Sequence, residues 1–267
     1  MRIDFEALGA RKKELEATYD HKLMPGGITM ARMDGRSFHK LLKKAEKPYD
    51  IAYITAMEAT AVALIKEFAC DLVYTQSDEI TLFWKELNLF DLRIQKLCSV
   101  LASFTAVHFS QRWDAKGITP SFDCRVWQEP TFKDAAENFL WREWDAAKNS
   151  VSMAAHTMFK QKELHRTDTK ERIAMMEGRG FHWNLLDDRL ERGSFFKKTT
   201  TFRPITEAEL LQVPVNHRHL HSKQVERSLI DRKKWPRLTT IANLTDIFFN
   251  EDFLSVEEDV EDAQGSK

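Results

Sequence analysis

The feature that most constrains the fold is a pair of short apolar segments, residues 71–75 and 79–84, joined only by the three residues 76–78. Both segments are rich in β-branched and aromatic residues, a pattern typical of the two strands of a β-hairpin. A third short apolar segment, residues 28–33, precedes them and is also predicted to be a strand. The chain is therefore expected to fold around a β-sheet.

Segments with helical spacing of apolar residues separate these strands. Helices are predicted at 4–18, 51–69 and 91–112, a short helix at 38–44, further strands at 121–127 and 194–202, and a helical stretch at 131–162 that breaks into two helices near 143–149. This order is close to the βαββαβ pattern of a ferredoxin-like fold. We therefore expect an α+β protein with an antiparallel sheet and helices packed on one face.

Composition excludes some classes of protein without naming a function. Lys and Arg total 40 against 41 Asp and Glu, so any nucleic-acid partner must be held by a local basic surface. The three cysteines form no CxxC pair, which argues against a disulfide framework or a zinc site. Apolar stretches are too short to span a bilayer. We expect a cytoplasmic protein with no membrane partner.

Two acidic positions are the most informative for chemistry. Asp34 follows the first predicted strand, immediately before Gly35, and Asp78 lies in the hairpin turn. In a ferredoxin-like sheet the first strand lies beside the hairpin, so the two carboxylates are expected to converge. Paired carboxylates can hold two Mg²⁺ ions, which stabilise the attacking and leaving oxygens of a phosphoryl transfer. However, Asp-Gly and Ser-Asp-Glu are also common turn sequences, and spacing alone favours that interpretation.

Several motifs occur in an order that resembles the tRNA-histidine guanylyltransferase family, which includes the bacterial and archaeal 3′–5′ RNA polymerases. They lie at 31–39 (ARMDGRSFH), 47–50 (KPYD), 74–79 (YTQSDE), 122–126 (FDCRV), 141–145 (WREWD, followed by Asn149 and Ser150) and 192–193 (RG). The resemblance covers more than half of the chain. It implies a polymerase-palm fold, two Mg²⁺ ions and assembly into tetramers.

The resemblance also implies an activity and a set of site residues. ATP or GTP activates the 5′ end of a tRNA, and the 3′-hydroxyl of an incoming nucleoside triphosphate then attacks that end. The metal ligands are expected to be Asp34, Asp78 and the carbonyl of Gly35. The residues expected to contact nucleotides are Arg36, Ser37, Phe38, His39, Lys47, Ser77 and Glu79. Arg36 is equally compatible with a structural ion pair.

One departure from the family pattern bears on the substrate. Enzymes specific for histidine tRNA resemble one another in a His-Ile-Asn-Asn-Leu-Tyr-Asn block, where residues 147–153 here read AKNSVSM. This is similar to the bacterial-type relatives that repair truncated tRNA 5′ ends by templated addition. Repair is therefore the expected activity. The alternatives are a nucleotide cyclase, which shares the palm and the metals, and an inactive RNA-binding palm.

Basic residues are the candidates for an RNA surface. One cluster lies at 160–172 and includes Lys170; a second lies at 232–237, where Lys233 and Lys234 flank Trp235, a candidate for base stacking. Either cluster is also compatible with an ordinary solvated surface. On the helix, Arg142, Asp145 and Asn149 share one face and predict either a hydrogen-bond network or a tRNA contact.

The same reasoning predicts the domain organisation. Residues 1–162 are expected to form the palm-like catalytic domain with its N-terminal helix, and 163–250 a C-terminal extension packed on the palm that offers tRNA contacts. The acidic segment 251–267 is expected to be disordered. Asp123 and Arg125 are expected to form an ion pair. The alternating His217, His219 and His221 have no acidic or cysteine partner nearby in sequence, and a metal site there is disfavoured.

Overall fold

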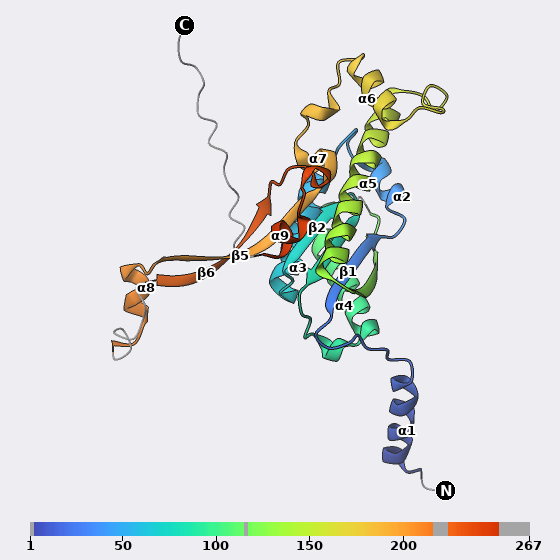
Figure 1. Ribbon diagram of the computed structural model, residues 1–267. Coiled ribbons are helices and arrows are strands. Elements are labelled where there is room, and N and C mark those ends of the chain that lie inside the picture. The colour runs from blue at the N-terminus through green and yellow to red at the C-terminus, as the bar shows by residue number, and fades with distance from the viewer. Residues whose placement is uncertain (1–2, 115–116, 216–223, 251–267) are drawn as a thin grey trace.

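A computed structural model describes residues 3–114, 117–215 and 224–250. Its centre is an antiparallel sheet with the strand order β4-β1-β3-β2-β5-β6 (Figure 1). The strands are β1 (Ile28–Gly35), β2 (Leu72–Gln76), β3 (Glu79–Trp84), β4 (Phe122–Glu129), β5 (Ser194–Pro204) and β6 (Gln224–Lys233). The predicted hairpin and the predicted α+β class with an antiparallel sheet are confirmed.

The predicted helices are present in the predicted order, and four further α-helices follow them within the described residues. They are α1 (Phe5–Ala17), α2 (Phe38–Leu41), α3 (Ile51–Phe68), α4 (Ile94–Ser110), α5 (Phe132–Met158), α6 (Thr169–Glu177), α7 (Asp188–Arg192), α8 (Glu207–Gln212) and α9 (Leu244–Phe249). Short 3₁₀ turns lie at Leu42–Lys44, Phe90–Leu92, Trp183–Leu185 and Leu238–Thr240. None of the helices in the described ranges is long and apolar enough to cross a membrane.

Helix α5 is a single continuous helix, so the predicted break near residues 143–149 is wrong. Thr131 caps its N-terminus by accepting a hydrogen bond from the Asp134 backbone N–H. The 27 residues that follow contain neither proline nor glycine, so nothing in the backbone interrupts the helix. The polar residues in its middle form side-chain contacts with the rest of the protein.

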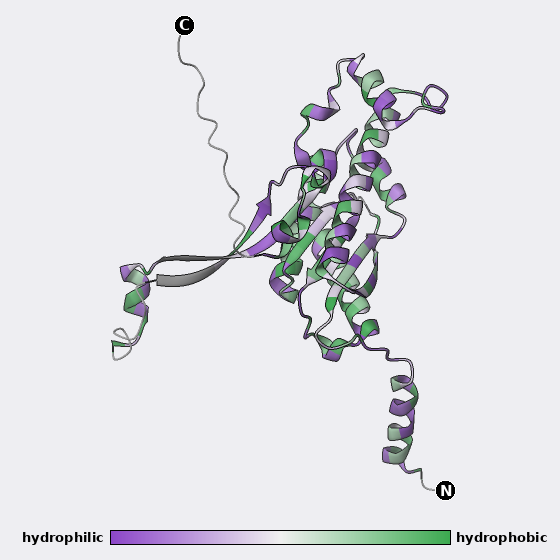
Figure 2. Cartoon of the chain, viewed as in Figure 1, coloured by the Kyte–Doolittle hydropathy of each residue, from purple (hydrophilic) through white to green (hydrophobic). Residues whose placement is uncertain are grey.

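Helices cover both faces of the sheet, which corrects the prediction that they pack on one face. On one face, Met33, Val73 and Ile80 pack with α3 and α4. On the other face, Met30 and Phe83 join the apolar residues of α5 and α9. The reason is that successive residues of the central strands are apolar in both directions, so each face must be covered. Figure 2 shows this concentration of hydrophobic residues in the central strands.

The C-terminal part continues the same sheet. β5 pairs with β2, and β5 pairs with β6 along a hairpin that projects from the body and carries α8 (Figure 1). Phe248 and Phe249 of α9 return to pack against Phe139 and Phe83. A separate cluster joins the last turns of α5 to α6 and Trp183. Helix α1 also projects, and it buries none of its residues.

Candidate active site

The end of β1 and the β2–β3 turn bring three carboxylates to one end of the sheet. Asp34 is paired in register with Glu79, and the Gly35 N–H donates to the Asp78 carbonyl at 3.0 Å. On the other side of β1, Asp123 of β4 lies opposite Asp34. Asp34 and Asp78 therefore lie together at this end of the sheet, although they are far apart in the sequence. We call Asp34, Asp78 and Glu79 the acidic edge.

Gly35 makes this close approach sterically possible. A Cβ atom at this position would lie 2.4 Å from the Phe38 ring and 2.8 Å from the Cβ of Asp78. Real Cβ atoms do not tolerate such contacts, so any side chain here would push the β2–β3 turn away from β1. The glycine keeps the two acidic segments in contact.

The electrostatics of this edge favour a bound cation. Burial raises the pKa of Asp78, and the nearby charge of Asp34 raises it further; the Ser77 hydroxyl, 3.1 Å from the Asp78 carboxylate, acts in the opposite direction. Burial likewise raises the pKa of Glu79 to about 7, against the attraction of Arg32. Burial therefore disfavours the charged forms of both carboxylates, and a cation bound beside them would favour those forms.

The residues present fit magnesium better than a metal that requires a closed protein shell. Among the described residues there is no group of three His, Cys, Asp or Glu side chains arranged to hold a metal. Mg²⁺ needs fewer protein ligands, because waters and substrate phosphates complete its octahedral shell. Two aspartates and a backbone carbonyl are a sufficient set.

Glu79 is held by helix α5. Arg142 donates to its carboxylate at 2.9 Å, and the Arg142 side chain is only 10 % exposed. The same helix face presents Asp145 and Asn149, which bond to each other at 3.0 Å. This face and the β2–β3 turn line a hollow of about 320 Å³ that contains Asp78. The helical spacing of Arg142, Asp145 and Asn149 thus produces a hydrogen-bond network beside the acidic edge.

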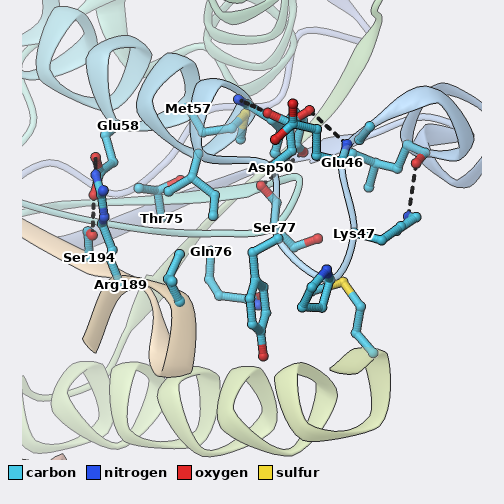
Figure 3. Close-up of a pocket in the computed structure, with 18 residues that line it drawn as sticks. Glu46, Lys47, Asp50, Met57, Glu58, Thr75, Gln76, Ser77, Arg189 and Ser194 are labelled. Carbon is cyan, nitrogen blue, oxygen red and sulfur yellow. Dashed lines mark hydrogen bonds and ion pairs between the residues drawn. The ribbon is translucent and has the colours of Figure 1, made fainter. Parts of the chain in front are cut away.

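A second pocket lies on the other side of the same turn (Figure 3). Its walls are the loop 45–50, the first turns of α3, the start of α7 and residues 75–77. Tyr53, Ile54 and Met57 give it an apolar interior, while Lys47 and Asp50 lie at one end and Glu58, Arg189 and Ser194 at the other. An apolar interior with polar groups at its ends suits a flat heterocycle that carries polar edges.

Hydrogen bonds fix the walls of this pocket. Asp50 caps α3 by accepting from the backbone N–H of Tyr53 at 2.9 Å and of Glu46 at 3.1 Å. The Tyr53 hydroxyl donates to the Ser77 carbonyl at 3.0 Å and so ties α3 to the acidic turn. Lys47 Nζ donates to the Leu42 carbonyl at 3.0 Å. Gln76 and Ser77 line both this pocket and the hollow beside α5.

The other wall of the pocket is anchored by Ser150 on α5. Its Oγ lies 2.8 Å from the Tyr49 hydroxyl, donates to the Leu190 carbonyl at 2.8 Å and accepts from Trp183 Nε1 at 3.1 Å. One buried hydroxyl therefore joins the loop that carries Lys47, helix α7 and the turn at Trp183.

Comparison with known proteins identifies the family. The family model Thg1, tRNAHis guanylyltransferase, matches residues 9–130. A solved bacterial tRNA(His) guanylyltransferase (Thg1)-like protein in complex with ATP is 30 % identical, with 71 % of this chain and 88 % of that chain covered and a TM-score of 0.67. The chain belongs to the Thg1 family of tRNA(His) guanylyltransferases.

Other members of the family extend the match. A bacterial Thg1-like protein in complex with GTP is 25 % identical, with 88 % of this chain and 94 % of that chain covered and a TM-score of 0.68. The tRNA(His) guanylyltransferase of Debaryomyces hansenii is 33 % identical over 141 residues, which are 48 % of this chain and 53 % of that protein. The matched region spans about half the length of the curated guanylyltransferases.

The structure places the predicted nucleotide contacts of the Thg1-type motifs in different environments. Arg36, Ser37 and His39 are exposed on the loop and helix after β1. Phe38 is 2 % exposed, and its ring packs against Tyr53, Phe109 and Phe122. The aromatic side chain therefore belongs to the core, and the nucleotide contact at Phe38 stays a prediction.

Part of the second basic cluster is engaged in contacts within the protein. Arg232 pairs with Asp187 and Asp188, and Arg237 pairs with Glu191. The half-buried Trp235 ring packs against Phe195 and Phe248, and base stacking on it stays a prediction. The contacts named here join parts of the C-terminal extension, residues 163–250, to one another.

The remaining candidates for an RNA surface differ in accessibility. Lys233 Nζ lies 3.1 Å from the Thr199 hydroxyl and 3.8 Å from Asp231. Lys170 and Lys234 are exposed. Asp123 and Arg125 form the predicted ion pair at 3.7 Å. His217, His219 and His221, like the acidic segment 251–267, lie outside the described residues.

Two functional candidates escaped the sequence reasoning. Arg32 lies two residues before Asp34 on the same face of β1, opposite Arg125 of β4 and Thr81 of β3. Arg32 Nε and Thr81 Oγ1 are buried polar atoms that lack a hydrogen-bond partner within the described part of the chain. Such atoms call for a ligand or water. The two-residue period of a strand would have placed Arg32 beside Asp34.

Proposed function

We propose that this protein is a magnesium-dependent nucleotidyltransferase that adds nucleotides in the 3′–5′ direction to the 5′ end of a tRNA. Membership of the Thg1 family and the likeness to relatives solved with ATP and GTP support the nucleotide chemistry. The observation that carries the proposal is the position of the acidic turn. Residues 76–77 of the β2–β3 turn line both the apolar pocket and the hollow beside α5. Asp78, the next residue of the turn, lies against the end of β1.

Each part of this arrangement has an assigned role in the proposal. Asp34, Asp78 and the Gly35 carbonyl hold two Mg²⁺ ions, which when bound neutralise phosphate charge and stabilise the attacking and leaving oxygens. The apolar pocket receives the base of ATP or GTP, and Lys47 at its edge offers a point charge to the phosphates. The bonds from Tyr53 to Ser77 and from Arg142 to Glu79 hold the acidic turn in position.

The test is addition of a labelled nucleotide to tRNA. The protein is incubated with Mg²⁺, ATP and one labelled nucleoside triphosphate, together with tRNA that is either full length or lacks its first nucleotide. We expect a product one nucleotide longer at the 5′ end of the truncated tRNA. Asp78→Asn is the matched control, because it keeps the size of the side chain and removes its charge. Abundant cyclic nucleotide from ATP alone, with no extended tRNA, would instead assign the palm to a cyclase.

We further propose that the natural reaction is templated 5′-end repair. The support is the segment 147–153, in which only Asn149 matches the block of the histidine-tRNA enzymes. The extended tRNA should carry the nucleotide complementary to the opposing base of the acceptor stem, whichever tRNA is used. Exclusive addition of guanosine to full-length histidine tRNA would contradict this proposal.

The assembly and the compartment complete the proposal. We infer a homotetramer in which tRNA is shared between subunits, and a reducing cytoplasmic environment. The projecting helix α1 and the projecting β5–β6 hairpin, with exposed Phe5 and Leu211, support the assembly because they leave apolar surface uncovered (Figure 1). The three free cysteines support the compartment. Sedimentation velocity measures the assembly, and a monomer at micromolar concentration would contradict it.

A further inference from the structure

Helix α5 exposes two tryptophans on its outer side. Trp141 is 50 % exposed and Trp144 is 52 % exposed, although large aromatic rings normally lie in the core. Their spacing of three residues places them on one side of the helix, roughly 4.5 Å apart along its axis. Lys148, one turn beyond Trp144, lies on the same side and is exposed. We call Trp141, Trp144 and Lys148 the tryptophan strip.

A cation accompanies each ring of the tryptophan strip. Lys148 Nζ lies 5.3 Å from the centre of the Trp144 ring, and the Arg142 guanidinium lies 4.2 Å from the centre of the Trp141 ring. An aromatic face beside a positive charge suits a nucleic-acid base together with its phosphate. Protein interfaces are also enriched in tryptophan and arginine, but they are depleted in lysine. The exposed Lys148 beside Trp144 is therefore the feature that favours RNA over a second copy of this chain.

The tryptophan strip also borders the acidic edge. The guanidinium of Arg142 stacks on Trp141 and, through Nη1, bonds to Glu79 at 2.9 Å. A single guanidinium group thus separates the first ring of the strip from the residue that follows Asp78. A nucleotide stacked on the strip would lie next to the hollow that contains Asp78.

We propose that the tryptophan strip binds unpaired nucleotides of the RNA substrate and so guides its end toward Asp34 and Asp78. This inference rests on the proposed function, since it names where that substrate is held. Stacking on Trp144 would contribute through contact between ring faces, and Lys148 would contribute one phosphate contact.

The experiment measures binding of the full chain to fluorescein-labelled tRNA that lacks its first 5′ nucleotide. Trp144→Ala is compared with Trp144→Phe and with Leu185→Ala, which removes an apolar side chain that is 82 % exposed outside α5. We expect Trp144→Ala to raise Kd roughly tenfold, in line with the loss of one stacked base, while Trp144→Phe restores most of the affinity and Leu185→Ala has no effect. Lys148→Gln should reduce the slope of log Kd against log salt by about 0.7, the contribution of one phosphate of a single strand.

Two outcomes would contradict the proposed role of the tryptophan strip. Equal Kd values for Trp144→Ala and Leu185→Ala would overturn the inference. Loss of self-association in Trp144→Ala, seen by sedimentation with no change in Kd for tRNA, would overturn it in favour of a second copy. The proposed function is judged separately, by nucleotide addition with the unsubstituted protein. In that assay Trp144→Ala should raise KM for tRNA more than it lowers kcat, whereas a purely structural defect would lower kcat and alter the circular dichroism spectrum.

Discussion

Glu143 provides a sharp test of how the C-terminal extension is attached to the palm. Its carboxylate, 3 % exposed, accepts a bond from Arg192 at 2.7 Å and a second bond from the backbone N–H of Leu238 at 2.8 Å. It thereby joins α5 to α7 and to the turn before α9. Replacing Glu143 with alanine removes one charge-assisted bond and leaves a buried N–H without a partner.

The expected cost follows from these two losses. A charge-assisted bond contributes about 1.5–3 kcal/mol, and an unpaired buried donor costs about 1–3 kcal/mol. Arg192 keeps Asp188 and Glu191 within 3.7 Å, so its charge stays partly compensated and the total lies in the lower part of the summed range. We expect Glu143→Ala to reduce the free energy of unfolding by about 3 kcal/mol.

Urea unfolding followed by circular dichroism measures this cost. The matched control is Glu137→Ala on the same helix, whose side chain is 57 % exposed and 3.6 Å from Lys133. We expect the control to change stability by less than about 0.5 kcal/mol. A loss of less than about 1 kcal/mol in Glu143→Ala, with an unchanged m-value, would refute the view that this carboxylate holds the extension.

Three further predictions concern the acidic edge. Asp34→Ala and Asp78→Ala should each abolish nucleotide addition while the thermal unfolding midpoint stays within a few degrees; full activity in either variant would remove that residue from the metal site. Because the pKa of Asp78 is raised and that of Glu79 is raised to about 7, the folded state binds protons more tightly than the unfolded chain. With a chelator present, the melting temperature should therefore fall as pH rises from about 5 to 8. Added Mg²⁺ should restore more of the melting temperature at pH 8 than at pH 5, and Glu79→Gln should flatten its dependence on pH. A melting temperature that rises with pH would contradict the raised pKa values of Asp78 and Glu79. Gly35→Ala, whose Cβ would overlap the Phe38 ring, should cost about 1–3 kcal/mol in urea unfolding and displace Asp78 enough to reduce activity; a fully active and equally stable variant would disprove the steric argument.

The sequence predicted those parts of the fold that local pattern determines. The β2–β3 hairpin, β1 and α3 were predictable because each has a clear two-residue or helical period and ends in turn residues. The meeting of Asp34 and Asp78 followed once β1 was placed beside the hairpin. Their proposed roles as metal ligands rest on the family motifs, because spacing alone favours a plain turn.

Other features depended on tertiary packing. The second layer of helices was missed, although successive residues of the central strands are apolar, a pattern typical of strands that are covered on both faces. Trp235 and the basic residues near it resemble an RNA surface in sequence, yet Arg232 and Arg237 pair with acidic residues of α7, and the half-buried Trp235 ring packs on Phe248 of α9. Phe38 is a similar case: it belongs to a family motif, but its ring is buried in the core.

The position of Ser150 has a consequence for what determines the shape of the apolar pocket. Its hydroxyl links Tyr49 of the pocket loop to Trp183 and to Leu190. Replacing Trp183 removes one partner of that hydroxyl, although Trp183 does not line the pocket. The shape of the pocket therefore depends on a residue outside its lining as well as on the loop that carries Lys47.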